Sequence, residues 1–339
     1  MSQEEIEFAK TYRANYTMAV SSITTCFFPG CPEKSINSHI LQKNGILSSI
    51  APDRHLMWHG VDHFSEGMMK FKRSGINEAF SFNCFCSKHD SELFKHIESG
   101  TINFNDYKSL LLFTIRTICN EKFRKMVNIK IYERQLSDAD ASPTFFKRQL
   151  EGLKYYEELG LKDLEKIEKV IWDDLKNSTE SFVFNTVSLP KREVCMSAFF
   201  TYETTEELND YRNTHGKDKE KVSDIFVNYF PVGNNSIFTI GYQKSNESTV
   251  KGFVNTFVKD NVKRLERKIS NLLLFRCETW VCSESLYNSR FKKCEKMFAS
   301  AAHYSANNIV ERKFFPITLF EGDLCKQFED WSKSVNVQF

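Results

Sequence analysis

Residues 26–31 read CFFPGC and residues 86–89 read CSKH, and these two stretches decide how the N-terminal part of the chain folds. A zinc ion takes about four tetrahedral ligands from Cys and His, usually as two close pairs, because a short loop can wrap one edge of the ion. Pro29 and Gly30 suit the tight turn that brings the cysteines of the first stretch together. The pattern predicts one structural Zn²⁺ with the ligands Cys26, Cys31, Cys86 and His89.

The second pair is followed by the apolar-periodic stretch DSELFKHIE, so we expect it to open a helix, where free N–H groups favour thiolate over thiol. A turn pair combined with a helix-start pair is the treble-clef arrangement. The alternative is a set of buried thiols with a surface histidine. Cys84 competes with Cys86 as a ligand, but a strand would point these two thiols to opposite faces, and only Cys86 has the two-residue spacing to His89.

Histidine is concentrated around the same stretches. Residues 26–96 hold four of the ten Cys and six of the eight His of the chain. His39 is left open as a zinc ligand or a base. A weaker alternative is a second metal site at His55, His59 and His63, whose spacing would place them on one helix face, but Gly60 and its neighbours favour a loop.

The remainder of the chain alternates between two patterns. Apolar residues at three- and four-residue spacing predict helices over residues 107–127 and 150–175, joined by SDADASPTF. A further amphipathic helix is expected over residues 250–275, and a final one after Asp323. Strands are predicted at 181–189, 194–203 and 272–282, and as a hairpin of 224–232 with 236–244 around GNN.

These patterns predict an α+β protein with three parts. Residues 1–103 are expected to form a zinc-stabilised treble-clef module, residues 104–180 a helical region, and residues 181–339 a C-terminal mixed α/β domain. Hydrophobic residues make up 41% and charged residues 27%, which is typical of an ordered globular chain.

Composition and missing motifs exclude several classes of function. No basic leader or long apolar span is visible, so we expect a cytoplasmic protein without a membrane segment, where clustered cysteines favour metal over disulfides. The chain lacks GxxxxGK[ST], GxGxxG and GxSxG, the motifs of P-loops, dinucleotide folds and α/β-hydrolases. A net charge of +2 gives no strong steering toward nucleic acid, so such binding needs a local patch.

Two basic runs and a second cysteine pair have simpler explanations. KDNVKRLERK at residues 259–268 can contact phosphates, but its two acids favour a solvated helix face. KFKR at residues 70–73 lies closer to the expected zinc site. Cys277 and Cys282 lie in an apolar context without His nearby, so we expect buried thiols.

CFFPGC, followed by SHI and by an Asn-bearing stretch before CSKHD, resembles the HNH, or His-Me finger, endonucleases that carry a structural zinc. The resemblance implies that His39 is the general base and that Asn77 or Asn83 orients it. Asp90 falls where the family has its last metal-binding His. The implied chemistry is hydrolysis of a phosphodiester bond in DNA or RNA by water, with Mg²⁺ or Mn²⁺ stabilising the transition state.

The resemblance covers about the first hundred residues and has departures. Ser38 stands where a metal-binding Asp or His usually precedes the base, and an insertion around residues 52–75 must be assumed. SHILQK with CSKHDSELF is also similar to uncharacterised bacterial proteins associated with phage defence. We therefore expect a nuclease of antiviral defence, or alternatively a non-catalytic zinc module that docks nucleic acid or a protein partner, with the C-terminal domain available for a protein partner.

Overall fold

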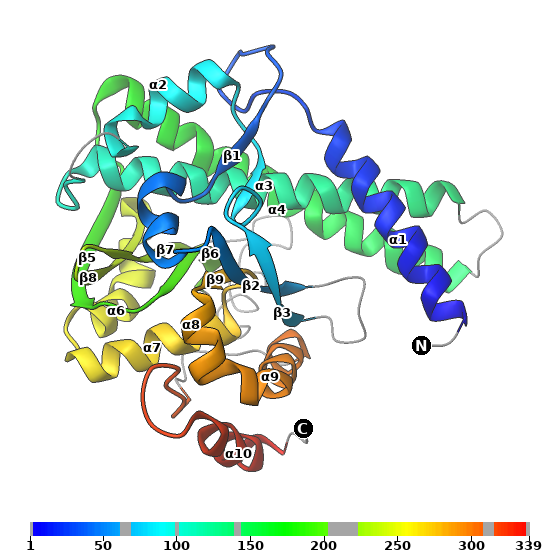
Figure 1. Cartoon of the computed structure of the whole chain (residues 1–339). Coiled ribbons are helices and arrows are strands. Elements are labelled where there is room, and N and C mark those ends of the chain that lie inside the picture. The colour runs from blue at the N-terminus through cyan, green and yellow to red at the C-terminus, as the bar shows by residue number, and fades with distance from the viewer. Residues whose placement is uncertain are drawn as a thin grey trace. The chain divides into compact units, whose positions relative to one another are not determined.

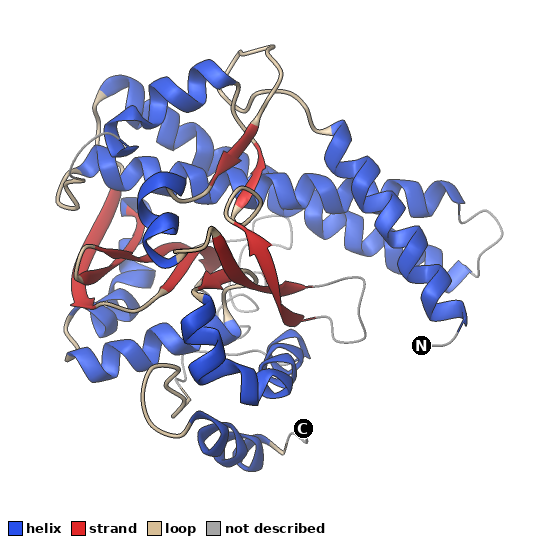
Figure 2. Ribbon diagram, in the orientation of Figure 1, coloured by secondary structure: helices blue, strands red, loops and turns tan. Residues whose placement is uncertain are grey.

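The computed structural model is a mixed α+β protein (Figures 1 and 2). Along the sequence, two long helices in the middle of the chain are preceded and followed by strands. It describes residues 3–61, 69–98, 102–138, 144–202, 223–307 and 315–336. The chain divides into two compact units. The first comprises Met1–Ile40 and Ser81–Thr179, and the second comprises Leu41–Asp62, Gly67–Phe80 and Glu180–Phe339.

The first unit is mainly helical. Its elements are α1 (Gln3–Ser22), β1 (Asn37–His39), β4 (Ser81–Asn83), α2 (Ser87–Glu98), α3 (Tyr107–Asp138) and α4 (Thr144–Asn177). β1 and β4 pair antiparallel, with Asn37 opposite Asn83 and His39 opposite Ser81. The order β1, β4 and then α2 is therefore a two-stranded ribbon followed directly by a helix.

Helices α3 and α4 confirm the two helices predicted for the middle of the chain, and both are longer than predicted. They run antiparallel, because Tyr107 near the start of α3 donates a 2.5 Å hydrogen bond to Asp174 near the end of α4. Residues 110–119 of α3 are buried on every side, as expected for a helix with an apolar run around its circumference. The sequence patterns gave no prediction for α1.

The second unit is built on a seven-stranded antiparallel sheet with the strand order β3-β2-β9-β6-β7-β8-β5. The strands are β2 (His55–Val61), β3 (Met69–Gly75), β5 (Phe182–Pro190), β6 (Val194–Thr201), β7 (Asp224–Val232), β8 (Asn235–Gln243) and β9 (Trp280–Cys282). Helices α6 (Glu247–Val258), α7 (Val262–Phe275), α8 (Glu284–Leu286), α9 (Glu295–Asn307) and α10 (Leu324–Val335) complete the unit.

The predicted hairpin around GNN is confirmed. β7 and β8 pair from Ile225 opposite Tyr242 to Val232 opposite Asn235. Gly233 in the turn has φ +58°, a left-handed conformation that glycine adopts without a steric penalty. The predicted strands that correspond to β5 and β6, and the helix after Asp323, are also present.

Two predictions for residues 250–282 are wrong. The single helix is two helices, since α6 ends at Val258 and α7 restarts after Asn261, whose side chain accepts a hydrogen bond from the backbone N–H of Arg264 at 3.0 Å. The predicted strand over 272–282 is helical as far as Phe275, and only β9 is extended. A short, fully buried apolar run has no periodicity that distinguishes a helix from a strand.

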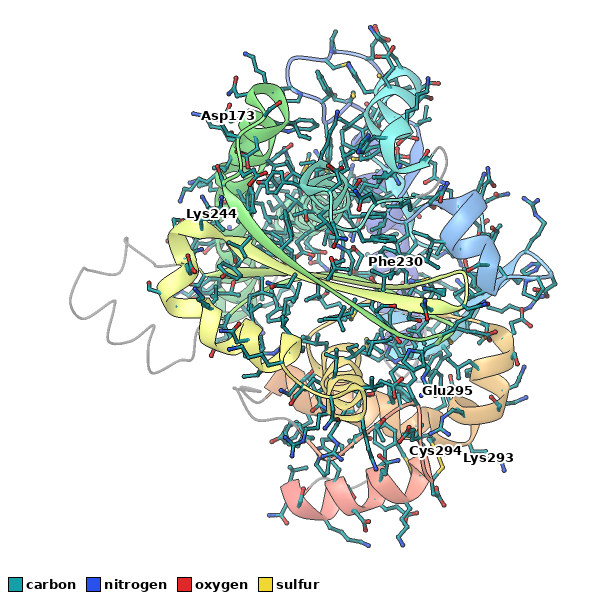
Figure 3. All side chains as sticks on the ribbon, turned by 90° about the vertical axis from the view of Figure 1, so that its left-hand side faces the viewer. Asp173, Phe230, Lys244, Lys293, Cys294 and Glu295 are labelled. Carbon is teal, nitrogen blue, oxygen red and sulfur yellow. A yellow bond between two sulfur atoms is a disulfide. The ribbon has the colours of Figure 1, made fainter. Side chains whose placement is uncertain are left out.

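One cysteine pairing was not predicted from the sequence. Cys294 and Cys325 form a disulfide beside the start of α9 and the start of α10 (Figure 3). The preference for metal applied to clustered cysteines, and this pair is not clustered in the sequence, because its members are 31 residues apart and meet only through the fold. Cys277 and Cys282 are buried thiols, as expected. No helix among the described residues is long and apolar enough to cross a membrane.

The units divide the chain differently from the three expected parts. Residues 41–62 and 67–80, which were placed in the zinc module, group with the C-terminal sheet. The reason is backbone pairing, because β2 is antiparallel to β9, with Met57 opposite Cys282. The expected insertion at residues 52–75 is thus largely a pair of strands, β2 and β3, that extends the sheet.

Candidate metal centre

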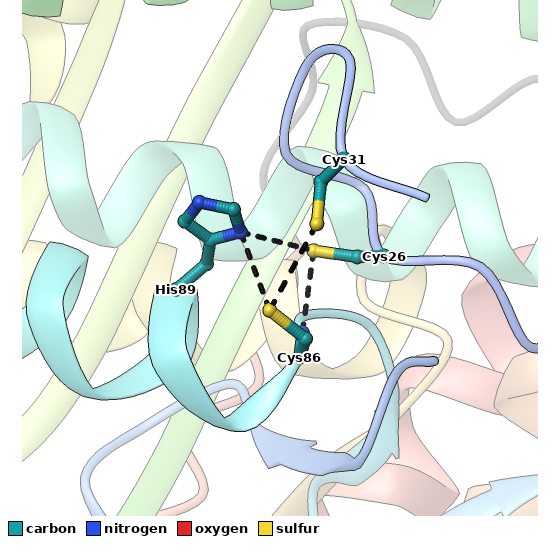
Figure 4. A group of neighbouring side chains, drawn as sticks. All are labelled: Cys26, Cys31, Cys86 and His89. Carbon is teal, nitrogen blue, oxygen red and sulfur yellow. Dashed lines mark hydrogen bonds between the residues drawn. The ribbon is translucent and has the colours of Figure 1, made fainter. Parts of the chain in front are cut away.

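The four predicted zinc ligands converge in the first unit (Figure 4). One ligand atom from each of Cys26, Cys31, Cys86 and His89 lies within 4.8 Å of the others. Nδ1 of His89 is 3.5 Å from Sγ of Cys26 and 3.3 Å from Sγ of Cys86, and the Sγ atoms of Cys31 and Cys86 are 4.0 Å apart.

These distances fit a tetrahedral ion. Metal–ligand bonds of about 2.3 Å to sulfur and about 2.0 Å to nitrogen place two tetrahedral sulfurs about 3.8 Å apart, and a sulfur and a nitrogen about 3.5 Å apart. The observed S–S and S–N separations lie close to both values. Three thiolates and one imidazole close the coordination shell, as in structural sites. The cluster can therefore hold a metal ion.

The turn that carries the first pair follows from its sequence. The N–H of Cys31 donates to the carbonyl of Phe28 at 3.0 Å, and Gly30 has φ +74°, the left-handed conformation this turn requires. The N–H of Cys26 donates to the carbonyl of Glu33 at 2.9 Å, which closes the loop. Cys26 Sγ also accepts a 3.2 Å hydrogen bond from the N–H of Cys86, so a backbone hydrogen bond joins the two pairs.

The start of α2 lowers the pKa of the Cys86 thiol, as expected. The backbone N–H of His89 is the main group that lowers the pKa of the Cys86 thiol. Burial instead raises the pKa of Cys26 to about 11, which two backbone hydrogen bonds partly oppose. A bound cation would favour the thiolate at both positions, since metal ligands must be deprotonated.

Aromatic side chains beside the cluster were missed by sequence reasoning. The Phe28 ring stacks on the His89 imidazole, and Trp172 of α4 meets the Phe28 ring edge-on with centroids 5.2 Å apart. Trp172 Nε1 donates to Glu168 at 3.3 Å, and Glu168 pairs with Lys122 at 2.6 Å. In the sequence, only the two phenylalanines inside CFFPGC indicated that aromatic rings lie beside the cluster.

Cys84 is not part of the four-ligand group. It is fully buried, and burial raises its pKa well above the ordinary range, with a hydrogen bond involving Cys119 as the next contribution. Cys86 rather than Cys84 is the cysteine of CFC that joins the group, as expected, although CFC follows β4 and is not part of a strand.

The residues expected to be catalytic lie on β1, β4 and α2 of the first unit. Ser38 and His39 end β1, Asn83 ends β4, and Asp90 is in the first turn of α2. The hydroxyl of Ser38 hydrogen-bonds to the Asp90 carboxylate, and the charge of His39 also acts on it. Asn83 is opposite Asn37 rather than His39, so it is only a diagonal neighbour of His39. Asn77 lies in the turn after β3, in the second unit.

Asp90 occupies an unusual environment. Burial raises its pKa, and the charge of Arg116 is the strongest opposing influence. Arg116 of α3 is only 2% exposed, with its guanidinium carbon 3.7 Å from the centroid of the Phe94 ring and Nη2 2.5 Å from Glu98. Among the described residues, Oδ1 of Asp90 and Nε and Nη1 of Arg116 are buried without a hydrogen-bond partner. Leaving buried polar groups without a hydrogen-bond partner costs free energy, so these atoms are candidates for contact with a ligand.

The alternative second metal site does not assemble from its described members. His55 and His59 lie four residues apart on strand β2, about 13 Å along the strand, which is too far to share one ion. His63 is outside the described residues. Asp53, His55 and Glu284 do approach within 4.8 Å, but Arg73 already pairs with both carboxylates. This group is an exposed ion-pair network.

No protein-family model, no curated protein and no solved structure matches this chain. The resemblance to HNH proteins therefore rests on the cysteine and histidine cluster, and the fold and geometry described above are the basis for any proposal of function.

Proposed function

We propose that the first unit is a zinc-stabilised, HNH-like phosphodiesterase module that acts on DNA or RNA. The structural ion is Zn²⁺, since the closed set of three cysteines and one histidine is typical of structural zinc sites. The observation that carries the catalytic part is the placement of His39 on β1, Asn83 on β4 and Asp90 in the first turn of α2, a ribbon-then-helix unit whose helix start carries two members of the metal cluster.

In this proposal His39 activates water, and Asp90 binds the Mg²⁺ or Mn²⁺ that offsets charge on the phosphorane. Support for Asp90 as a ligand is its carboxylate oxygen that lacks a protein partner. Asn83, on the same face of the ribbon as His39, would orient the imidazole. Antiviral defence is the proposed setting, on sequence similarity alone, and plaque counts on cells with and without the protein would test it.

The zinc proposal is tested by metal analysis of the purified chain. We expect one zinc per chain, lost in Cys31→Ser together with the fold of β1, β4 and α2, because metal binding and folding are coupled. Cys84→Ser is the matched control, since this thiol lies outside the cluster. Full zinc content in Cys31→Ser, or loss in Cys84→Ser, would contradict the ligand set.

The nuclease proposal is tested by incubating the protein with single- and double-stranded DNA and with RNA, plus Mg²⁺ or Mn²⁺. Cleavage should disappear in His39→Ala and Asp90→Asn while zinc content and melting temperature stay unchanged. His96→Ala is the control, because His96 is a partly exposed imidazole of the same unit that pairs with Asp106. Equal cleavage by wild type and His39→Ala, or none by either, overturns the proposal.

One observation favours a second candidate, a non-catalytic module that docks nucleic acid or a protein. The Asp90 carboxylate accepts a hydrogen bond from the Ser38 hydroxyl and interacts with the positive charge of Arg116. Both interactions weaken Asp90 as a ligand for a divalent cation. Oligonucleotide binding without cleavage, and without Mn²⁺ binding at Asp90, would select this candidate.

A further inference from the structure

The first turns of α4 expose several large apolar side chains. Phe145 is 80% exposed, Tyr156 68% and Tyr155 57%, and the two tyrosine rings meet edge-on with their centroids 5.7 Å apart. Exposed apolar residues that gather on one element, rather than scattering singly, mark interaction surfaces. This part of α4 is therefore a surface that another molecule can cover.

These side chains belong to one stripe on the side of α4 that faces away from α3. Leu150 is 4% exposed and Glu157 pairs with Lys125 of α3 at 3.1 Å, so both mark the inward side of the helix. At 3.6 residues per turn, residues seven apart recur on one side of a helix, and residues three or four apart lie at its two edges. On the side opposite Leu150, this spacing selects a stripe, here called the α4 stripe, that consists of Phe145, Arg148, Gln149, Gly152, Tyr155, Tyr156 and Leu159.

The α4 stripe is symmetric about Gly152. Phe145 and Leu159 each lie seven residues from Gly152, at the two ends of the stripe. A two-fold axis at Gly152 therefore brings the first half of one stripe against the second half of an identical, antiparallel one. Phe145 of each copy then meets Leu159 of the other. On one edge, Arg148 meets Tyr155 of the other copy to within about 1.5 Å along the helix axis, and the other edge pairs in the same way.

The glycine at the midpoint has no role in the packing of the described residues. A side-chain carbon added at Gly152 would have no atom within 4 Å. Glycine weakens the interior of a helix, and its advantage is that another backbone can approach closely. Two antiparallel helices that cross at Gly152 use this advantage, because neither has a side chain at the point of closest approach.

The charges along the stripe balance when two copies meet. Arg148 lies on one edge, and the exposed Glu151 is one turn away on the same flank. Two copies place two positive and two negative side chains along this flank, with the two Arg148 residues about 12 Å apart along the axis. Each guanidinium then lies beside the Tyr155 ring of the other copy, which favours a cation–π contact. A balanced surface fits an identical helix, whereas nucleic acid requires an excess of positive charge.

The exposed area is sufficient for a specific contact. At about 200 Å² for each ring, the exposed fractions of Phe145, Tyr155 and Tyr156 amount to about 400 Å² per copy. Leu153 and Phe146, which are 43% and 41% exposed beside the stripe, add to this area. Two copies together reach the roughly 1,000 Å² at which specific interfaces begin, so we expect a reversible dimer rather than a permanent one.

We propose that the α4 stripe binds a second copy of the chain, with the two α4 helices packed antiparallel across Gly152. The symmetric spacing, the glycine at the midpoint and the balanced charges together favour an identical partner. This inference goes beyond the proposed function, and its tests do not depend on cleavage of nucleic acid.

The first experiment measures the mass of the full chain by sedimentation velocity over a wide range of protein concentration. The wild type should change from monomer to dimer as its concentration rises. Tyr155→Ala with Tyr156→Ala should weaken the dimer by roughly 30-fold or more, as expected for residues at the centre of an interface. Val262→Ala is the matched control, because Val262 is an exposed apolar residue of α7, 46% exposed, outside the stripe.

Gly152→Gln separates the dimer contact from folding. Glutamine is a better helix former than glycine, so the melting temperature of the variant should not fall when it is measured at a concentration where the wild type is monomeric. The added side chain should nevertheless abolish the dimer, because it fills the crossing point. A variant that dimerises as well as the wild type overturns the proposal.

Cross-linking tests the antiparallel register. A mixture of Phe145→Cys and Leu159→Cys chains should form a disulfide-linked dimer on exchange with oxidised glutathione, which is reduced to two thiols as the bond forms. Either variant alone should behave like the wild type, because its introduced thiols lie about 21 Å apart along the axis of an antiparallel pair. Cross-linking of each variant with itself would show a parallel pair and overturn the proposal.

Two further outcomes of the sedimentation experiment also overturn it. A wild type that stays monomeric at every concentration leaves the face to a different protein or to nucleic acid. A dimer that the tyrosine variant retains lies on another surface of the chain. Failure of the nuclease test would leave the dimer standing, since the mass measurement uses no substrate.

Discussion

The ring of Phe28 stacks on the imidazole of His89, with centroids 3.8 Å apart and planes 11° from parallel. Phe28 therefore contacts two members of the metal cluster, since its N–H also donates a hydrogen bond to Cys26 Sγ at 3.5 Å. Replacing a residue that orients a metal ligand typically lowers the metal affinity by about 10- to 100-fold.

Phe28→Ala should therefore weaken zinc retention by about 10-fold without removing any ligand, because the His89 ring loses the surface that holds its orientation. The measurement is the rate and extent of zinc transfer to a colorimetric chelator. Phe28→Tyr keeps the stack and should behave like the wild type. Identical zinc transfer from the alanine and tyrosine variants would contradict a role for the ring.

The buried His59 gives a prediction for pH. Its side chain is surrounded by Phe71, Trp280 and Phe298, and burial lowers its pKa to about 3. The unfolded chain binds a proton below about pH 6.5, whereas the folded chain does not until near pH 3. The free energy of unfolding is therefore at its full value above pH 6.5. As the pH falls below 6.5, it decreases by about 1.4 kcal/mol per pH unit, because the unfolded chain binds a proton at His59 that the folded chain does not.

Urea unfolding of the wild type and His59→Leu at pH 7.5, 5.5 and 4.5 isolates this effect, since other titrating groups cancel in the difference. The wild type should lose about 1–3 kcal/mol more than the variant across this range. A difference between the two proteins that does not change with pH would show that His59 is hydrated or paired.

The disulfide between Cys294 and Cys325 should be detectable by peptide mass mapping without reductant. Because it closes a loop of 31 residues, loop-closure entropy predicts that Cys325→Ser lowers the free energy of unfolding by roughly 3–4 kcal/mol. Adding reductant should destabilise the wild type by a similar amount and leave Cys294→Ser with Cys325→Ser unchanged. Equal sensitivity of both proteins to reductant would refute the assignment.

Arg192 and Glu266 form a bidentate ion pair in the second unit, at 2.7 and 3.0 Å, with the Glu266 side chain only 2% exposed. Glu266→Gln should cost about 3 kcal/mol of unfolding free energy, because Arg192 keeps its charge without a counter-ion. Arg192→Met with Glu266→Leu should recover most of the loss, since no charge is then left unpaired. Urea denaturation of the wild type, Arg192→Met, Glu266→Leu and the double variant gives the coupling energy, and additive losses would mean that the pair does not interact.

Prediction from sequence succeeded where the information was local. The spacing of CFFPGC and CSKH identified four residues that meet, because each pair is placed by its own turn or helix start. The long helices α3 and α4 and the hairpin of β7 with β8 followed from periodicity and from a glycine-containing turn. The catalytic assignment of His39, Asn83 and Asp90 stays a prediction.

Only the tertiary structure decided the features that join distant residues. The sequence by itself determined the four-residue cluster, the long helices α3 and α4 and the hairpin of β7 with β8, because ligand spacing, side-chain periodicity and turn residues act over a few residues. It did not reveal that β2 pairs with β9, that Cys294 meets Cys325, or that the buried Arg116 pairs with Glu98. Such contacts depend on which buried surfaces meet, and many distant pairings satisfy the same local pattern until the packed core selects one of them.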